Sequence, residues 1–167
     1  MIAKSYILEN LRSLDYRYRN AHSAKEALFC SKLAILELCG WIEESMDDMV
    51  RVCATRHLKN HDNRNYCERD IIRRNYGFDY ESNFRSMLMR LIGLIAIEKL
   101  EKKVDQRVYA SMKAALSSLK TTRNAEAHTH LKGTTRILNA PSVTIGQFQA
   151  LYDGLTEFER KIKRMKR

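Results

Sequence analysis

The chain has 167 residues, of which 44% are hydrophobic and 30% charged, with six glycines and one proline. This length fits one domain that buries its own core, and the composition excludes a fibrous or intrinsically disordered protein. The formal charge of +10 and the pI near 9.6 favour a polyanionic partner, because basic surfaces bind phosphate backbones through counterion release.

Apolar residues recur at helical spacing along nearly the whole chain, and no stretch alternates with the period of two that marks a strand. A first helix is expected over residues 4–19. Ser23 and Glu26 form a capping box, which predicts a long second helix from there to about Leu58. Its apolar stripe holds one face over its whole length, which is typical of a helix packed in a bundle.

A third, shorter helix is expected over residues 65–75, with Gly77 as its C-terminal stop. A fourth is expected over residues 80–103. Its middle is apolar almost all round, and such a helix belongs in the centre of a bundle.

A fifth amphipathic helix is expected over residues 105–119, and Thr144 with Gln147 forms a second capping box at the start of the last helix. That last helix runs into a basic C-terminal tail, residues 160–167, which carries six lysines and arginines. The prediction is a single all-α domain spanning residues 1–167. We expect an up-and-down bundle of four to six helices with a long second helix.

The sequence favours a cytoplasmic protein. The N-terminal stretch has neither the long apolar core nor the cleavage pattern of a signal peptide, so free thiols are expected. The most apolar run, residues 91–97, is much shorter than the roughly 20 residues that cross a bilayer, and no membrane partner is expected. The four cysteines are Cys30, Cys39, Cys53 and Cys67.

The stretch TTRNAEAHTH, residues 121–130, contains an arginine, an asparagine and a histidine in a suggestive order. The spacing alone indicates nothing, because arginine precedes histidine by four to six intervening residues five times in this chain. Random placement predicts about one and a half such pairs. Arg123 is distinguished because Asn124 follows it directly, a helix of strong propensity precedes it, and a small residue stands before His128. The similar RNAH at Arg19–His22 is interpreted as the end of the first helix.

The geometry of a helix limits how these residues cooperate. The two threonines before Arg123 predict a break between the preceding helix and the next turn. If residues 123–130 are helical, Asn124 and His128 lie one turn apart on the same face. Arg123 and His128 are then turned by about 140° from each other. They can share one phosphate only if Arg123 stands at a helix start, or if a second subunit brings its own copy alongside.

The motif RNAEAH in an all-α chain of this size resembles the Arg-x(4–6)-His motif of the HEPN superfamily (higher eukaryotes and prokaryotes nucleotide-binding domain). The stretch ELCGWIEESMDDMV, residues 37–50, is similar to the ribonuclease-type branch called RiboL-PSP. The resemblance covers most of the chain in outline, as a helical bundle with the motif late in the sequence.

The resemblance implies a metal-independent endoribonuclease without a cofactor, active as a homodimer in whose interface the two motifs meet. By this resemblance His128 is the general acid and base, Arg123 is the phosphate clamp and Asn124 orients them. The implied substrate is RNA. The implied role is that of a toxin or an antiphage or stress effector, with an antitoxin or regulatory protein as partner. Some members carry a tyrosine, modified by a nucleotidyltransferase, just before the histidine. This chain has Ala127 there, so that mode of neutralisation is not expected.

The chemistry of RNA suits these residues. RNA carries its own nucleophile, the 2′-hydroxyl, so a base that deprotonates it and a cation that stabilises the phosphorane suffice for cleavage to 2′,3′-cyclic phosphate ends. Histidine exchanges protons near neutral pH, and arginine presents a planar, permanently charged fork to phosphate oxygens. DNA lacks the hydroxyl and is not expected to be cut. The role of His130 stays open.

Two other constellations compete with the motif. Cys53, His57, His61 and Cys67 are four ligand types that zinc accepts, but their spacing matches no common zinc module, and HLKNHDNRN is expected to break the helix before His61. We expect no metal there. The acids Glu43, Glu44, Asp47 and Asp48 are interpreted as the solvated face of the second helix rather than as a magnesium site, with Glu43 placed to reach the motif.

Two alternatives from other functional classes remain. The first is a catalytically silent HEPN-like bundle that binds RNA or protein as a scaffold or regulator, since the same positive charge serves it equally well. The second is a helical adaptor that docks its basic tail, residues 160–167, onto an acidic partner.

Overall fold

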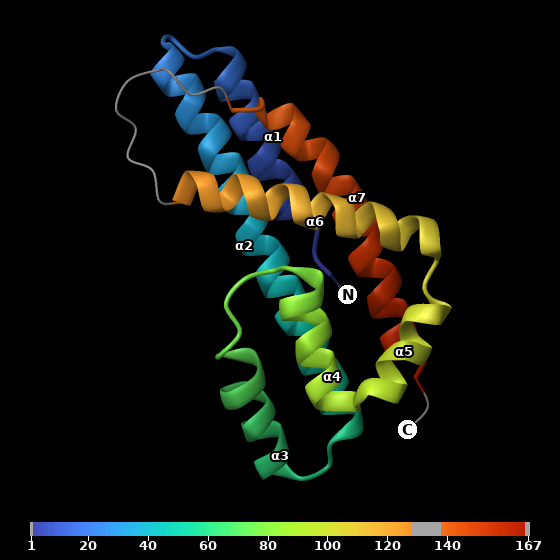
Figure 1. The fold of residues 1–167 in the computed structure, drawn as a ribbon. Helices are drawn as coiled ribbons and strands as arrows, with labels where there is room; N and C mark the ends of the chain where they lie inside the picture. Colours follow the sequence, from blue (N-terminus) through green and yellow to red (C-terminus); the bar gives the residue numbers. More distant parts are fainter. Residues whose placement is uncertain (1, 128–137, 166–167) are drawn as a thin grey trace.

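A computed structural model of the chain describes residues 2–127 and 138–165, and no strand occurs among those residues (Figure 1). The all-α prediction is confirmed. The helices are more divided than expected, because the predicted third and fourth helices each contain a π-helical segment and the fourth is interrupted. In chain order the elements are α1 (Ser5–Arg19), α2 (Ala24–His57), α3 (His61–Tyr66), η1 (Cys67–Ile72), η2 (Tyr80–Arg85), α4 (Ser86–Ile92), α5 (Leu94–Lys103), α6 (Gln106–Ala127) and α7 (Pro141–Lys163).

The long second helix is confirmed as α2, whose 34 residues span about 50 Å. Ser23 caps it as predicted, its hydroxyl accepting a hydrogen bond from the Glu26 amide at 3.2 Å. The Glu26 carboxylate accepts from the His22 amide at 2.9 Å, one residue earlier than in a standard capping box. Helices α1 and α7 pack against α2, and α6 crosses this layer (Figure 1).

The chain breaks between α2 and His61, as predicted. Asn60 caps α3, its side-chain oxygen accepting a hydrogen bond from the Asp62 amide at 2.7 Å. The third helix was expected over residues 65–75 but begins four residues earlier, because this cap supports a start there. It continues as a π-helical segment and ends at Ile72.

The expectation of one central helix over residues 80–103 is wrong. Gly93 has φ +81°, a left-handed conformation that ends α4 and lets α5 start in a new direction. Leu94 and Ile95, at the start of α5, are 57% and 73% exposed. The most apolar run of the sequence therefore lies partly on the surface, although Ile97 and Leu100 further along α5 are buried.

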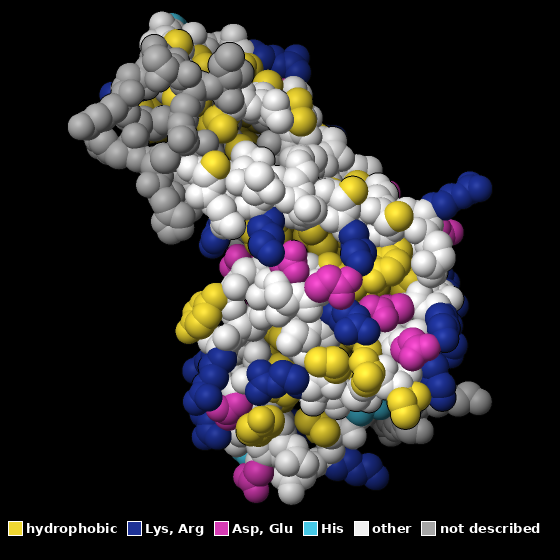
Figure 2. All heavy atoms as spheres, in the orientation of Figure 1, with side chains coloured by type: hydrophobic (Ala, Val, Ile, Leu, Met, Phe, Trp, Pro, Cys, Tyr) yellow, Lys and Arg dark blue, Asp and Glu magenta, His cyan; other side chains and the backbone are white. Residues whose placement is uncertain are grey.

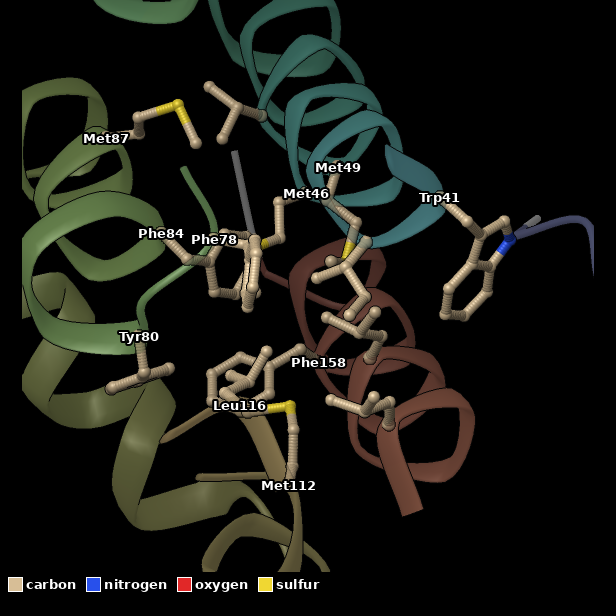
Figure 3. Close-up of a cluster of buried hydrophobic side chains, with 14 of the residues drawn as sticks. Trp41, Met46, Met49, Phe78, Tyr80, Phe84, Met87, Met112, Leu116 and Phe158 are labelled. Atoms are coloured by element: carbon tan, nitrogen blue, oxygen red, sulfur yellow. The ribbon is translucent and has the colours of Figure 1, made fainter. Parts of the chain in front are cut away.

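The core between α2, α6, α7 and the segment from Phe78 to Leu88 is built from aromatic and methionine side chains (Figure 3). The Phe158 ring of α7 lies with its centroid 5.6 Å from those of Phe84 and Tyr109 and 5.7 Å from that of Tyr80. Tyr80 is buried, donates its hydroxyl to Glu101 at 2.7 Å, and has a pKa raised chiefly by burial. One ring cluster thus fixes α7, η2 and α6 relative to one another.

The crossing of α6 and α7 requires a glycine. A Cβ placed on Gly154 of α7 would lie 2.5 Å from Cβ and 2.6 Å from Sδ of Met112 in α6. Because a contact to Cβ cannot be relieved by rotating the methionine, the two helices would have to move apart.

We expect Gly154→Ala to lower the free energy of unfolding by about 1–3 kcal/mol through overpacking. Gly146→Ala, in the same helix, is the matched control, because its Cβ would meet nothing within 4 Å. That substitution should stabilise the protein by up to about 1 kcal/mol through helix propensity. Urea denaturation followed by circular dichroism measures the change in the free energy of unfolding for both variants. A change of the same sign in the two variants would contradict the close crossing.

The start of α7 also differs from the prediction. The helix begins at Pro141, four residues before the expected start, because proline at the first helical position needs no amide partner. Thr144 and Gln147 therefore do not form a capping box. Thr144 is buried, and the Gln147 side chain donates a hydrogen bond to the Ser118 hydroxyl at 3.3 Å.

The basic segment 160–167 is in part the end of α7 rather than a free tail. Three of its cations pair with acids one turn earlier in the helix, at N–O distances of 2.6, 3.3 and 2.7 Å. These pairs are Arg160 and Lys161 with Glu157, and Lys163 with Glu159. In the described part of the chain, no helix has both the length and the apolar character needed to cross a membrane.

Candidate functional site

Arg123 and Asn124 lie in the last two turns of α6. The predicted break at the two preceding threonines is wrong. The hydroxyls of Thr121 and Thr122 donate to the carbonyls of Ser117 and Ser118 at 3.1 and 3.0 Å, and the helix continues through Ala127. Threonine in a helix can bond back to the preceding turn in this way. Arg123 therefore does not stand at a helix start.

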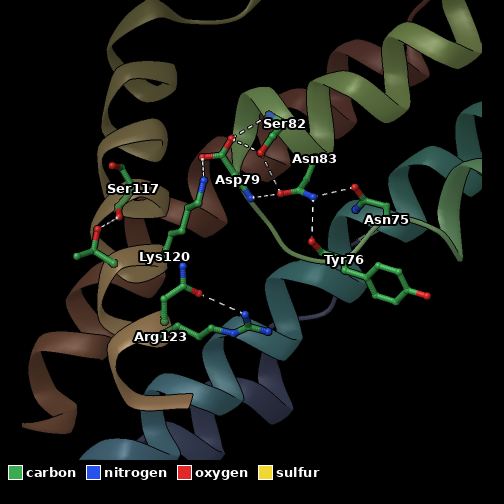
Figure 4. Close-up of polar contacts among 10 residues, drawn as sticks. Asn75, Tyr76, Asp79, Ser82, Asn83, Ser117, Lys120 and Arg123 are labelled. Atoms are coloured by element: carbon green, nitrogen blue, oxygen red, sulfur yellow. Dashed lines mark hydrogen bonds and ion pairs between the residues drawn. The ribbon is translucent and has the colours of Figure 1, made fainter. Parts of the chain in front are cut away.

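The structure brings together part of the predicted site. Arg123 and Asn124 line one hollow, and a third α6 residue, Lys120, lines it with them one turn earlier (Figure 4). His128 and His130 lie outside the described residues. The hollow has a volume of about 220 Å³, and its opposite wall is the turn at residues 76–79 together with the start of η2.

The Arg123 guanidinium makes two loose contacts. One Nη atom lies 3.9 Å from the Glu43 carboxylate of α2, and the other donates to Asn124 Oδ1 at 3.4 Å. The side chain is 37% exposed, so solvent screens the ion pair with Glu43 and makes it weak. The expectation that Glu43 reaches the motif is confirmed. The weak pairing leaves Arg123 able to exchange Glu43 for a phosphate oxygen.

Lys120 is held in place from across the hollow. Its ammonium lies 3.1 Å from Asp79 Oδ2, while Asp79 Oδ1 accepts from the amide and hydroxyl of Ser82 at 2.9 and 2.8 Å. The bond from the Ser82 amide is the main reason that the pKa of Asp79 falls to about 2. Asp79 is therefore ionised at neutral pH, and it orients Lys120 toward the turn (Figure 4).

The turn that faces α6 is fixed by Asn83. Its side chain accepts from the Asp79 amide at 2.9 Å and donates to Asn75 Oδ1 at 2.9 Å and to the Tyr76 carbonyl at 3.1 Å. Gly77 adopts φ +113°, and a Cβ there would lie 3.3 Å from Asn83 Oδ1. The hollow thus has one wall on a helix and one on a tightly bonded turn.

The buried thiol of Cys39, on which the charge of Arg123 acts, is not activated as a nucleophile. Burial raises the pKa of Cys39 to about 12, although the positive charge of Arg123 acts in the opposite direction. A thiol with that pKa stays protonated at neutral pH and does not attack substrates. All four cysteines are buried and free, in agreement with the sequence analysis.

The structure gives no support to a zinc site at Cys53, His57, His61 and Cys67. Cys53 and Cys67 are buried, and burial raises the pKa of Cys53 to about 11. His61 instead contacts the Asn65 side chain at 3.0 Å. Within residues 2–127 and 138–165, no three histidine, cysteine or acidic side chains are grouped so that they could hold a metal ion.

The acids of α2 serve different local roles. Asp48 binds Arg51 at 2.8 Å, and Glu44 is exposed. Asp47 is half-buried, and burial raises its pKa to about 6. Of the four predicted solvent-facing acids, Glu43 is the one that contacts the motif.

Sequence reasoning missed most of the hollow. Lys120 precedes Arg123 by three residues in a helical segment, and that spacing was a usable signal. Asp79 and Asn83 carried no such signal, because they come from a turn about 40 residues away in the sequence. Comparisons of the chain with protein-family models, with curated proteins and with solved structures find no match.

Proposed function

We propose that this chain is a metal-independent endoribonuclease of the HEPN type that cleaves RNA as a homodimer. The observation that carries the proposal is the Arg123 guanidinium, which is weakly paired, partly exposed, and beside Asn124 and Lys120 at one hollow. In this proposal Arg123 clamps the scissile phosphate, Asn124 orients it and His128 acts as general base and acid. A role as a toxin or as an antiphage or stress effector, restrained by an antitoxin or regulatory protein, belongs to the same proposal.

The reaction balances without a metal or cofactor. The general base takes the proton of the 2′-hydroxyl, the oxygen attacks the neighbouring phosphorus, and the P–O5′ bond breaks as the leaving oxygen receives a proton. The products are a 2′,3′-cyclic phosphate and a 5′-hydroxyl. A fixed guanidinium on the developing phosphorane contributes about 10²- to 10³-fold, as other fixed donors do at developing charges.

Lys120 adds a second cation to this arrangement. It lies one turn before Arg123 on the same face of α6, so both can approach phosphates of one strand. Its pairing with Asp79 keeps it extended across the hollow. We assign it a role in binding the strand rather than in the chemical step.

The homodimer draws support from two features. Because α6 continues through Ala127, Arg123 does not occupy the helix start that would let it act with His128 of the same chain, which favours a second subunit. In addition, Phe29, Leu33 and Leu36 form an exposed apolar stripe along α2 at spacings of four and three residues. Such a stripe is typical of a helix that packs against a partner. Glu43, the contact of Arg123, is two turns beyond its end on the same helix.

The purified protein should cleave single-stranded RNA in the presence of EDTA and leave DNA of the same sequence intact. Polyadenylation tests for 2′,3′-cyclic phosphate ends. Products with such ends should resist polyadenylation until a phosphatase has removed the cyclic phosphate. Arg123→Ala should lower the rate by about 10²- to 10³-fold. Arg12→Ala is the matched control, since Arg12 is exposed on α1, which contributes no residue to the hollow, and should leave the rate unchanged.

Robust cleavage by His128→Ala would contradict the assigned roles. Salt-sensitive RNA binding without any cleavage by the unaltered protein would instead support the alternative of a silent RNA- or protein-binding bundle.

A further inference from the structure

A second cationic surface lies at the opposite end of α6 from Arg123. Four basic side chains from α5 and the end of α7 line a hollow of about 620 Å³ there. Ala96, Leu100 and Met165 contribute apolar surface to the same lining. We call this hollow the α5–α7 groove; its cations are Lys99 and Lys103 of α5, Lys161 of α7, and Arg164 directly after α7.

Most of this charge is not neutralised by the protein. Lys161 lies 3.3 Å from the Glu157 carboxylate. Lys99, Lys103 and Arg164 have no ion-pair or hydrogen-bond partner for their side chains among residues 2–127 and 138–165. Helices α5 and α7 both end at this groove, and each C-terminus contributes about half a negative charge. Subtracting these and Glu157 from the four cations leaves an excess of about two positive charges.

We infer that the α5–α7 groove binds the phosphodiester backbone of a single-stranded nucleic acid. Lys99 and Lys103, one turn apart on α5, line the same hollow as the cations at the end of α7, so successive phosphates of one strand can be contacted from both helices. The apolar part of the lining suits the face of a base. The inference rests on the proposed function only for the identity of the strand as RNA.

The shape of the surface favours a strand over a bilayer. A lipid surface is flat, and cations that line the walls of a hollow approach it poorly, whereas a flexible strand can enter the hollow. The groove adjoins the start of α6, and Arg123 stands 17 residues after that start, which corresponds to about 25 Å. A strand that reaches both sites therefore spans several nucleotides, and the groove becomes a second anchor outside the cleavage site.

The test measures binding without cleavage. A fluorescein-labelled 12-nucleotide DNA strand, which lacks the 2′-hydroxyl, is titrated with protein at several salt concentrations while its anisotropy is followed. Lys99→Glu/Lys103→Glu should weaken binding about tenfold or more and reduce the salt slope by about 1.4, since each phosphate contact on a single strand contributes about 0.7. Lys99→Gln/Lys103→Gln should produce a smaller change in the same direction.

The matched control is Arg17→Glu/Lys25→Glu, which changes the net charge equally near the turn between α1 and α2, at the far end of the molecule from the C-terminus (Figure 1). Circular dichroism verifies that each variant is folded. Equal losses for the two Glu pairs would overturn the inference, because net charge alone would then explain binding. The inference would also be overturned if Lys99→Glu/Lys103→Glu lost binding to vesicles of anionic lipid while it bound the strand unchanged.

Failure of this inference and failure of the proposed function give different results. If the protein cuts no RNA but the groove variants lose DNA binding selectively, the binding site in the groove is supported and the nuclease is contradicted. If RNA is cut but the groove variants bind the strand like the control, the nuclease is supported and the binding site in the groove is contradicted. Figure 2 shows lysine and arginine side chains at many places on the lower half of the face that it draws, so the control must change the net charge equally.

Discussion

Subunits carrying Arg123→Ala and subunits carrying His128→Ala, when co-expressed, are expected to cleave RNA at about a quarter of the wild-type rate, although each variant alone should be nearly inactive. Random association makes about half of the dimers mixed. If Arg123 of one subunit acts with His128 of the other, each mixed dimer has one site with both altered residues and one site with neither. Because half of the dimers are mixed and each mixed dimer has one of its two sites intact, a quarter of all sites are active, which gives a quarter of the wild-type rate.

The structural reason for this expectation is the course of α6. The helix is unbroken through Ala127, and the hydroxyls of Thr121 and Thr122 are bonded within it, so Arg123 does not occupy the helix start at which we expected it to act with His128 of its own chain. In the proposed homodimer, the second subunit brings its His128 to Arg123 without any change in α6.

Two affinity tags of different size allow mixed dimers to be isolated, and initial rates are measured on a fluorogenic RNA. The control mixes Arg123→Ala with the double variant Arg123→Ala/His128→Ala, which has no intact site in any combination and should recover nothing. Isolated mixed dimers of the two single variants that also recover nothing would place both residues of each site in the same subunit.

Phe158→Ala is expected to lower the free energy of unfolding by about 3–5 kcal/mol, the usual cost of removing a fully buried aromatic ring. Phe158 is 0% exposed, and its ring contacts those of Tyr80, Phe84 and Tyr109. These rings come from η2 and α6, the two elements that form the walls of the hollow at Arg123. We therefore expect the variant to loosen the site as well as the core.

Urea denaturation followed by circular dichroism measures the loss, and thermal melting should fall by about 10 °C. Tyr16→Ala is the matched control, because Tyr16 of α1 is 70% exposed and its truncation should change stability by less than about 0.5 kcal/mol. Comparable losses for the two aromatic residues would show that the ring cluster is not the main support of the fold.

Local signals in the sequence predicted the elements that need no distant partner. The Ser23 cap and the apolar periodicity after it predicted α2, because a side chain that satisfies an orphan amide within one turn acts locally. Periodicity failed over residues 80–103, where it could not show that Gly93 takes a positive φ and redirects the chain. It failed again at Thr121 and Thr122, whose hydroxyls can either cap a helix or bond back into one.

For the candidate site, the sequence singled out Arg123 and Asn124 and placed Glu43 near them. It gave no indication of Asp79, Asn83 or the turn that they hold, because residues about 40 positions apart meet only when α6 packs across η2 and α7.

What the residues determine by themselves is an all-α, strongly basic chain with a long second helix and an Arg-Asn motif late in its sequence. Composition, charge and helical period are local properties and do not depend on how the helices pack. The tertiary structure alone brought Lys120 opposite Asp79, set Arg123 against Glu43, and gathered the lysines of α5 with the cations of α7 into one groove. Each of these arrangements depends on which helix faces meet, and that is set by the burial of Phe158 and its neighbours and by the close approach that Gly154 allows.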